Sequence, residues 1–256
     1  MERAGRRRLE RLEKQEKRAA ARYEKAKPSV FAAVQDKIPD GLRGKLELAF
    51  CKGFRLVFEK GDGLIGKTYD ADRLRGRYEQ YAAAARTKAT GARLRRLRSG
   101  ARSAVRGGTG VALAEGAALG VLGIGLPDIP LFLGGLLRGL YRIALSYGFD
   151  CHSDRERRYL LLLIAVSLSK GEERERLAAS AEAVAAGGSF PSLEECMDAA
   201  AGRLAEEMLA AKFVQGLPLV GLAGGLRNVP VYRRVTAYAA RTYERRWLLE
   251  QENREK

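Results

Sequence analysis

Apolar residues recur at the spacing of an α-helix in one segment after another of this 256-residue chain, and this pattern restricts the fold more than any other feature. The clearest example lies between Ile129 and Tyr147, where apolar side chains share one face over several turns. No regular alternation of strand and helix patterns, which is typical of a parallel sheet, accompanies it. We therefore expect an all-α multi-helix bundle that is long enough to bury a core without disulfide bonds.

A stretch rich in glycine and poor in charge, residues 107–137, lies in the middle of the chain. It contains nine glycines and only two charged residues, Glu115 and Asp128. A membrane span needs ~20 uninterrupted apolar residues, and this stretch does not provide them. Pro127 and Pro130 predict a bend instead. We expect a central hairpin of two apolar helices, which is either buried in the core or lies as a re-entrant element in a membrane interface.

Four polar residues are predicted to line an apolar pocket between the closely packed helices: Glu115, Asp128, Arg138 and Asn228. A carboxylate among apolar neighbours needs a partner, a helix end or a proton. Asp128 stands at the start of a predicted helix, where acidic residues commonly cap free backbone N–H groups. The alternative is that Asp128 recognises a ligand or a partner.

The net charge of +16 is concentrated in the first 106 residues, which hold 29 Lys and Arg against 13 Asp and Glu. The rest of the chain holds 18 of each kind. A concentrated positive field attracts an anionic partner, either nucleic acid or the negatively charged leaflet of a membrane. The alternative is a solvated surface whose charges are screened by salt.

The densest part of this charge lies in residues 86–106, a segment without any acidic residue. Leu94, Leu97 and Ala101 form a narrow apolar stripe along it. A basic amphipathic helix of this kind lies on a lipid surface with its apolar side down, and each cation near an anionic leaflet contributes about 1 kcal/mol. Eight cations are predicted to bind the membrane or another anion: Arg86, Lys88, Arg93, Arg95, Arg96, Arg98, Arg102 and Arg106.

The two ends of the chain are predicted to differ from its middle. Residues 1–27 form a charged helical extension, which has too little apolar surface to pack on its own and is expected to project or fray. Residues 28–250 form the helical domain, and residues 251–256 form a tail. The first segment lacks the apolar core of a secretory signal, and three widely separated cysteines fit a reducing compartment. We expect a cytoplasmic protein.

Residues 61–68, GDGLIGKT, match the spacing of both a P-loop and a dinucleotide-binding loop. Either loop follows a buried strand, whereas the residues before Gly61 have helical periodicity. We interpret the segment as a glycine-rich turn between two helices, with a nucleotide site as the alternative. Cys151 and His152 are interpreted as loop residues, because adjacent side chains point apart and too few ligands for a metal surround them. No metal or cofactor is expected.

Local signals also predict where helices begin and end. Gly148 followed by Phe149 is typical of the turn that ends a helix. Ser153 with Glu156, and Ser192 with Glu195, have the spacing of capping boxes. We therefore expect helices to begin just after these two serines.

Several blocks of the chain resemble the EcsC protein family: residues 48–70, 123–150, 155–169 and 217–246, whereas Cys151 and His152 depart from the family pattern. The most specific part is GIGLPDIPLFLGGLLRGLYRIALSYGFD, residues 123–150, and the last block contains Asn228. The namesake of the family is encoded with an ABC transporter, and its loss impairs secretion and membrane-protein processing. The resemblance implies a membrane-linked accessory role and supplies no catalytic residues. It also places Lys67 and Thr68 in a family pattern that is not tied to nucleotide hydrolysis.

The sequence thus predicts a non-enzymatic EcsC-family protein, a lipid-binding accessory or adaptor at the inner face of the cell membrane that is linked to transport or secretion. Its predicted partners are an anionic membrane surface and an ABC transporter or another membrane protein. The main alternative is a nucleic-acid-binding protein that uses the same basic half, although few aromatic residues lie among the cations to stack bases. A nucleotide-binding protein that uses residues 61–68 is the other alternative.

Overall fold

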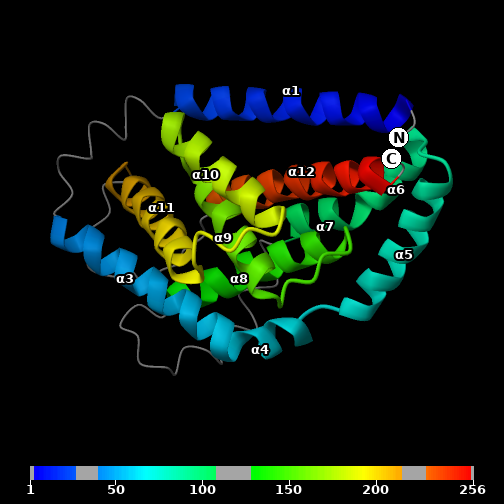
Figure 1. Cartoon of the computed structure of the whole chain (residues 1–256). Helices are drawn as coiled ribbons and strands as arrows, with labels where there is room; N and C mark the ends of the chain where they lie inside the picture. The colour runs from blue at the N-terminus through cyan, green and yellow to red at the C-terminus, as the bar shows by residue number, and fades with distance from the viewer. Residues whose placement is uncertain (1–2, 27–39, 108–127, 215–228, 255–256) are drawn as a thin grey trace.

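The computed structural model describes residues 3–26, 40–107, 128–214 and 229–254. These residues fold into eleven α-helices and one π-helical turn, and none of them lies in a β-strand, so the prediction of an all-α bundle is confirmed (Figure 1). The elements are α1 (Arg3–Ala26), α3 (Asp40–Leu56), the π-helical turn η1 (Val57–Gly61), α4 (Asp62–Lys67), α5 (Ala71–Thr87), α6 (Gly91–Leu97), α7 (Ser99–Gly107), α8 (Asp128–Leu145), α9 (Asp154–Leu168), α10 (Gly171–Ala185), α11 (Leu193–Val214) and α12 (Val229–Arg254).

Helix α9 lies at the centre of the bundle, because its sequence is apolar on every side over two turns. Every residue in 160–166 is at most 1% exposed. Helices α10, α11 and α12 all pack against α9 (Figure 1). A helix that is apolar all round is stable only when neighbours surround it, so this arrangement follows from the sequence.

Helix α8 places its apolar face against α3, α7 and α12. It ends as predicted, because the N–H of Phe149 donates to the carbonyl oxygen of Ala144 (3.1 Å) and Gly148 has a φ of 81°. Only glycine fits at this position, since a Cβ atom on Gly148 would lie 2.3 Å from the ring of Tyr78. Helix α8 is the second arm of the predicted hairpin; the first arm falls on residues 108–127, outside the described residues.

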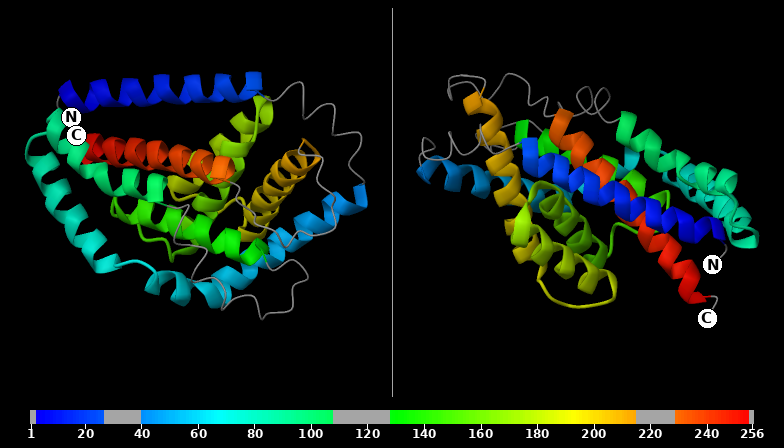
Figure 2. Two further views of the ribbon diagram at one scale, coloured as in Figure 1. Left: turned by 180° about the vertical axis from the view of Figure 1, so that it is seen from behind. Right: turned by 90° about the horizontal axis from the view of Figure 1, so that it is seen from above.

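Helix α1 lies along α12 and does not project from the bundle (Figures 1 and 2). Its Leu12 is 2% exposed. Arg8 donates two hydrogen bonds of 2.7 Å to Glu244, and the hydroxyl of Tyr23 donates to the carbonyl oxygen of Leu168 (3.1 Å). The expectation that this helix has too little apolar surface to pack is wrong, because hydrogen bonds and ion pairs to α12 and its neighbours hold it. The division into residues 1–27, 28–250 and 251–256 stays a prediction.

Both predicted capping boxes begin a helix, but only one closes in both directions. At α11 the N–H of Glu195 donates to the hydroxyl of Ser192 (3.2 Å), and the Glu195 carboxylate accepts from the N–H of Ser192 (2.8 Å). At α9 the N–H of Glu156 donates to the hydroxyl of Ser153 (3.3 Å). The Glu156 carboxylate is instead buried and binds Arg246 through two hydrogen bonds of 3.0 Å. The half-buried guanidinium of Arg246 therefore replaces the backbone N–H as its partner.

The glycine-rich segment 61–68 is helical, so its interpretation as a turn between helices is wrong. Helix α3 continues through η1 into α4, and the turn follows at residues 68–70. The hydroxyl of Thr68 donates to the carbonyl oxygen of Ile65 (2.7 Å) and closes the end of α4. Because backbone N–H groups inside a helix are already bonded to its own carbonyl groups, the segment does not form the phosphate-cradling loop that a nucleotide site requires.

Candidate anion-binding surface

The basic segment 86–106 is divided among three helices and does not form one amphipathic helix. Helix α5 ends at Thr87, and Lys88 has an extended backbone (φ −156°, ψ 110°). The hydroxyl of Thr90 then accepts a hydrogen bond from the N–H of Arg93 and begins α6. The prediction of a continuous helix is wrong at this point, because a threonine cap favours a new helix start.

The apolar stripe of this segment faces the interior of the protein. Leu94, Leu97 and Ala101 are 4%, 3% and 1% exposed and belong to the same core as α8 and α12. Their apolar surface is already removed from water by the fold. The prediction that this stripe lies in a lipid surface is therefore wrong, and whatever binds here meets only the polar side of these helices.

Three of the eight predicted cations bond to other groups of the protein, and one of them, Arg86, is nevertheless exposed. Arg86 donates to the amide oxygen of Gln251 (3.0 Å) and to the hydroxyl of Tyr78 (3.1 Å). Arg93 donates to the carbonyl oxygens that end α5, at 2.9 and 3.2 Å. Arg98 is only 13% exposed and pairs with Glu244 at 3.7 Å. These three side chains stabilise the packing of α5, α6 and α7 and are not free for a ligand.

The other five cations are exposed, and we name them the cationic surface: Lys88, Arg95, Arg96, Arg102 and Arg106. In the described part of the chain, no hydrogen bond or ion pair engages their side chains. No acidic residue occurs between Glu79 and Glu115 to neutralise them. The cationic surface therefore keeps its charge available for an external anion.

The N-terminal end of α1 lies beside α6 and adds to this charge (Figures 1 and 2). Arg3 and Arg7 are exposed at that end of α1. Two acids near the end of α12 are paired, Glu252 with Arg6 at 4.0 Å and Glu250 with Arg246 at 3.6 Å. Two basic segments that are far apart in the sequence thus lie on one side of the molecule.

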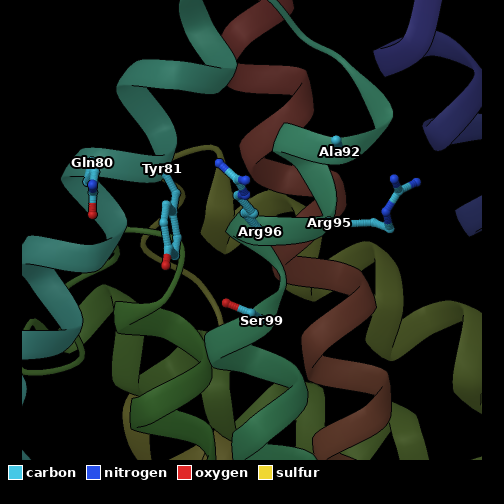
Figure 3. A pocket seen from close by; sticks show the side chains of 6 residues that line it. All are labelled: Gln80, Tyr81, Ala92, Arg95, Arg96 and Ser99. Atoms are coloured by element: carbon cyan, nitrogen blue, oxygen red, sulfur yellow. The ribbon is translucent and has the colours of Figure 1, made fainter.

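An open hollow of about 630 Å³ lies within the cationic surface, between α5 and α6 (Figure 3). The Arg96 and Tyr81 side chains lie side by side in the hollow, and the Tyr81 hydroxyl is on the side of Ser99, the first residue of α7 (Figure 3). Arg95 points to the other side, toward α1 (Figure 3). The six lining residues include no Asp or Glu: Gln80, Tyr81, Ala92, Arg95, Arg96 and Ser99.

Glu244 of α12 is the buried anchor beneath this surface, and its side chain is 5% exposed. Burial lowers the pKa of Arg8, but the hydrogen bond and the charge of Glu244 outweigh burial and raise that pKa above its ordinary value. Burial also lowers the pKa of Arg98, which Glu244 only partly offsets. One carboxylate thus binds an arginine from α1 and an arginine from the junction of α6 and α7.

The predicted polar pocket is only partly described. Glu115 and Asn228 lie outside the described residues, and Asp128 is the first residue of α8. Arg138 donates a hydrogen bond to the carbonyl oxygen of Thr68 at the end of α4. A basic side chain near a helix C-terminus satisfies a free carbonyl group there, so the observed contact of Arg138 joins α8 to α4.

The geometry of the described residues supports neither a Cys151–His152 catalytic pair nor a metal site. Cys151 is 1% exposed, whereas the neighbouring His152 is exposed, so the two side chains point apart as predicted. Among the described residues, no three His, Cys, Asp or Glu lie close enough together to hold a metal ion. In the same part of the chain, no helix combines the length and apolar character needed to cross a membrane.

Comparison with known families decides the relationship of this chain. The model of the EcsC protein family matches residues 3–248. This chain belongs to the EcsC protein family. The match extends from α1 to α12 and includes every helix that carries the cationic surface. No curated protein and no solved structure matches the chain.

Sequence reasoning missed the residues that organise the surface of this EcsC-family protein. The hydrogen bond of Arg8 with Glu244 joins residues 236 positions apart, and no local pattern marks such a pair. Tyr81 and Ser99 line the hollow but lie among ordinary helix residues. The only sequence feature that marks Ser99 is its closeness to Arg96 and Arg98 in the chain, and this feature does not predict that Ser99 lines a hollow.

Proposed function

We propose that this EcsC-family protein is a non-enzymatic accessory protein that binds the anionic inner face of the cell membrane through its cationic surface. The observation that carries the proposal is the set of five exposed cations without acidic neighbours in 80–107, joined by the N-terminal end of α1. A surface of this kind gains free energy from an anionic leaflet, because each cation near it contributes about 1 kcal/mol.

Binding of this kind is adsorption without insertion of the described helices. The apolar stripe of α6 and α7 is buried in the core, so the attraction is electrostatic. Electrostatic attraction between exposed charges is screened by salt, with a Debye length of about 10 Å at 0.1 M and about 3 Å at 1 M. The bound protein is therefore expected to leave the membrane reversibly when salt is raised.

Co-sedimentation with lipid vesicles tests the proposal. At low salt the protein is expected to bind vesicles that contain phosphatidylglycerol and not vesicles of phosphatidylcholine alone, and 1 M salt should release it. Replacement of Arg95, Arg102 and Arg106 by Gln should weaken binding about a hundredfold, at about 1 kcal/mol for each charge. Equal recovery on anionic and neutral vesicles at low salt would contradict the proposal.

A matched control distinguishes vesicle binding by the cationic surface from binding that depends only on the net charge of the protein. Lys45, Lys52 and Lys60 are exposed on α3 and η1, at the other end of the bundle from α6 (Figure 1). Their replacement by Gln removes the same three charges and should weaken binding much less. If both triple variants lose binding equally, the protein responds to its total charge and has no dedicated surface.

Nucleic acid is the competing anion for the same cations. A nucleic-acid-binding protein would bind duplex DNA or RNA with an affinity that falls steeply as salt rises. Adding tRNA to the vesicle assay, at a phosphate concentration equal to that of the anionic lipid, distinguishes the two functions, because a membrane protein should stay on the vesicles. Transfer of the protein to tRNA would favour the nucleic-acid function.

The accessory role is the second part of the proposal. A protein held at the membrane by α1, α6 and α7 leaves the surfaces of α3, α10 and α11 for contact with an integral membrane protein (Figure 1). We propose an ABC transporter as that partner, on the family resemblance alone. Chemical crosslinking to a co-expressed ABC transporter, compared between the wild type and the triple arginine variant, tests whether membrane binding is required for the contact.

A further inference from the structure

We infer that the hollow between α5 and α6 binds the phosphomonoester headgroup of a membrane lipid, a step that rests on the proposed membrane function. The hollow combines a concave shape with several different hydrogen-bond donors (Figure 3). A flat cationic surface responds to charge density, whereas a hollow with directed donors can select one headgroup.

The lining of the hollow fits an anion with several oxygen atoms. The Arg96 guanidinium, the Tyr81 and Ser99 hydroxyls and the Gln80 amide are all donors. The lining contains no carboxylate that would repel an anion or occupy the guanidinium. Arginine binds phosphate through two parallel N–H···O bonds, so the Arg96 guanidinium is the group that orients the ligand.

A phosphomonoester uses these donors better than a phosphodiester does. A phosphomonoester has three terminal oxygens and a charge of about −1.5 to −2 at neutral pH. A phosphodiester has two free oxygens and one charge, so it offers these donors fewer acceptors and a weaker charge. The Arg96 fork can take two oxygens of a phosphomonoester, and the Tyr81 or Ser99 hydroxyl can donate to the third.

The position of the hollow favours a lipid over a soluble phosphate. A pocket for a small soluble ligand buries most of the ligand surface, and this hollow is wide open to solvent (Figure 3). It lies, however, within the cationic surface, with Arg95 on its rim. Adsorption of the surrounding cations to a leaflet raises the local concentration of headgroups, and a weak individual site then contributes through multivalency.

The test compares two kinds of anionic vesicle at matched surface potential. Phosphatidylcholine vesicles containing phosphatidic acid, a phosphomonoester, are set against vesicles containing phosphatidylglycerol, a phosphodiester. We expect the full chain to bind the phosphatidic acid vesicles about tenfold more tightly, because hydrogen bonds to a charged group are the strong ones. Equal binding to both anionic vesicles overturns the inference but leaves the proposed function intact, whereas binding to neither overturns both.

Charge-conserving variants locate the preference. Arg96→Lys keeps the charge and loses the fork, so it should remove most of the preference for phosphatidic acid vesicles over phosphatidylglycerol vesicles. Tyr81→Phe should lower the preference by a smaller factor. Arg106→Lys is the matched control outside the hollow and should leave the preference unchanged. If Arg96→Lys and Arg106→Lys behave alike, the hollow is not the site; circular dichroism verifies that each variant is folded.

A soluble phosphomonoester distinguishes the source of the headgroup. Glycerol 3-phosphate carries the same phosphate without the lipid tails, and NMR titration of the full chain reports whether it binds at Arg96. Weak binding, with a far stronger response to phosphatidic acid vesicles, supports a lipid headgroup. Tight binding of glycerol 3-phosphate together with no vesicle preference shows that the hollow serves a soluble ligand, and this result overturns the inference.

Discussion

The arginines of one short basic segment differ in what they contact. Arg98 is 13% exposed and lies against the buried carboxylate of Glu244, whereas Arg96 and Arg102, within four residues of it, are exposed and unpaired in the described part of the chain. The helical phase of each residue decides the difference, because side chains on one face of α6 and α7 meet α12 and those on the other face meet water. Net charge alone therefore says little about how many cations can bind a ligand.

The inner arginines contribute to stability and the outer ones are available for binding. A buried guanidinium needs a carboxylate partner, since an uncompensated charge in the interior is strongly unfavourable. An exposed guanidinium contributes little to stability but keeps its full field in solution. Stability and membrane binding should consequently respond to different members of the same segment, and substitutions can separate them.

The largest effect is expected for Glu244→Gln. The substitution leaves Arg8 and Arg98 without their shared carboxylate in a site where Glu244 is 5% exposed. We expect a loss of about 3–5 kcal/mol in the free energy of unfolding, measured by urea denaturation. Glu250→Gln is the control: its side chain is 42% exposed, and it should change stability by no more than about 0.5 kcal/mol. Equal losses in the two variants would show that Glu244 is not a buried anchor.

The next effect concerns the docking of α1. Leu12 is 2% exposed, and Leu12→Ala should weaken the contact of α1 with the bundle by about 2–3 kcal/mol. Trypsin should then cleave the many basic sites of α1 faster than in the wild type, while the core resists. Gln15→Ala, on the exposed side of α1, should not change the cleavage rate. Rapid cleavage of α1 in the wild type would show instead that the helix projects.

A matched pair of arginine substitutions compares the two classes directly. Arg98→Gln removes a partner of Glu244 and should lower stability by about 1 kcal/mol, with little effect on vesicle binding. Arg102→Gln should leave stability within about 0.5 kcal/mol of the wild type and weaken binding to anionic vesicles. Urea denaturation and vesicle co-sedimentation on both proteins provide the comparison. If both variants lose stability and vesicle binding to the same degree, the arginines of this segment do not fall into a stabilising class and a binding class.

The smallest effect is a pH dependence at the start of α11. Hydrogen bonds from the Ser192 hydroxyl and from its backbone N–H lower the pKa of Glu195. A carboxylate whose pKa is lower in the folded state contributes stability above its unfolded pKa, and this contribution is lost as pH falls through the folded pKa. Glu195→Gln should therefore flatten the acidic part of a plot of stability against pH. An unchanged slope would show that the capping box does not contribute.

Much of the fold could be predicted from the sequence because helical periodicity is a local property. The all-apolar turns in 160–166, the end at Gly148 and the caps at Ser153 and Ser192 were all readable within a few residues, and the structure confirms them. The break at Thr90 was missed, because the basic residues on either side of it continue the same composition. A threonine cap is a weak signal when no change in hydrophobic pattern accompanies it.

The cations of the candidate site could be predicted from the sequence, but their arrangement in space could not. The eight cations were identified from their density, and the helical pattern gave the apolar stripe beside them. Whether that stripe meets lipid or the protein core depends on α8 and α12, which lie far away in the sequence. The partner of Glu156 shows the same limit, since its capping spacing was correct but Arg246 lies 90 residues farther along the chain. Contacts of this range have no signature in a single sequence.

The docking of α1 on α12 also has a consequence for synthesis of the protein. Helix α1 is synthesised before the other described helices and α12 after them, so Arg8 has no carboxylate at Glu244 until α12 has been made. Contacts between distant parts of a chain form late, because the loop between them must close first. In a nascent chain the pairing of Arg8 with Glu244 is therefore among the last contacts of the described helices to form, and translation must reach α12 before α1 can dock along it.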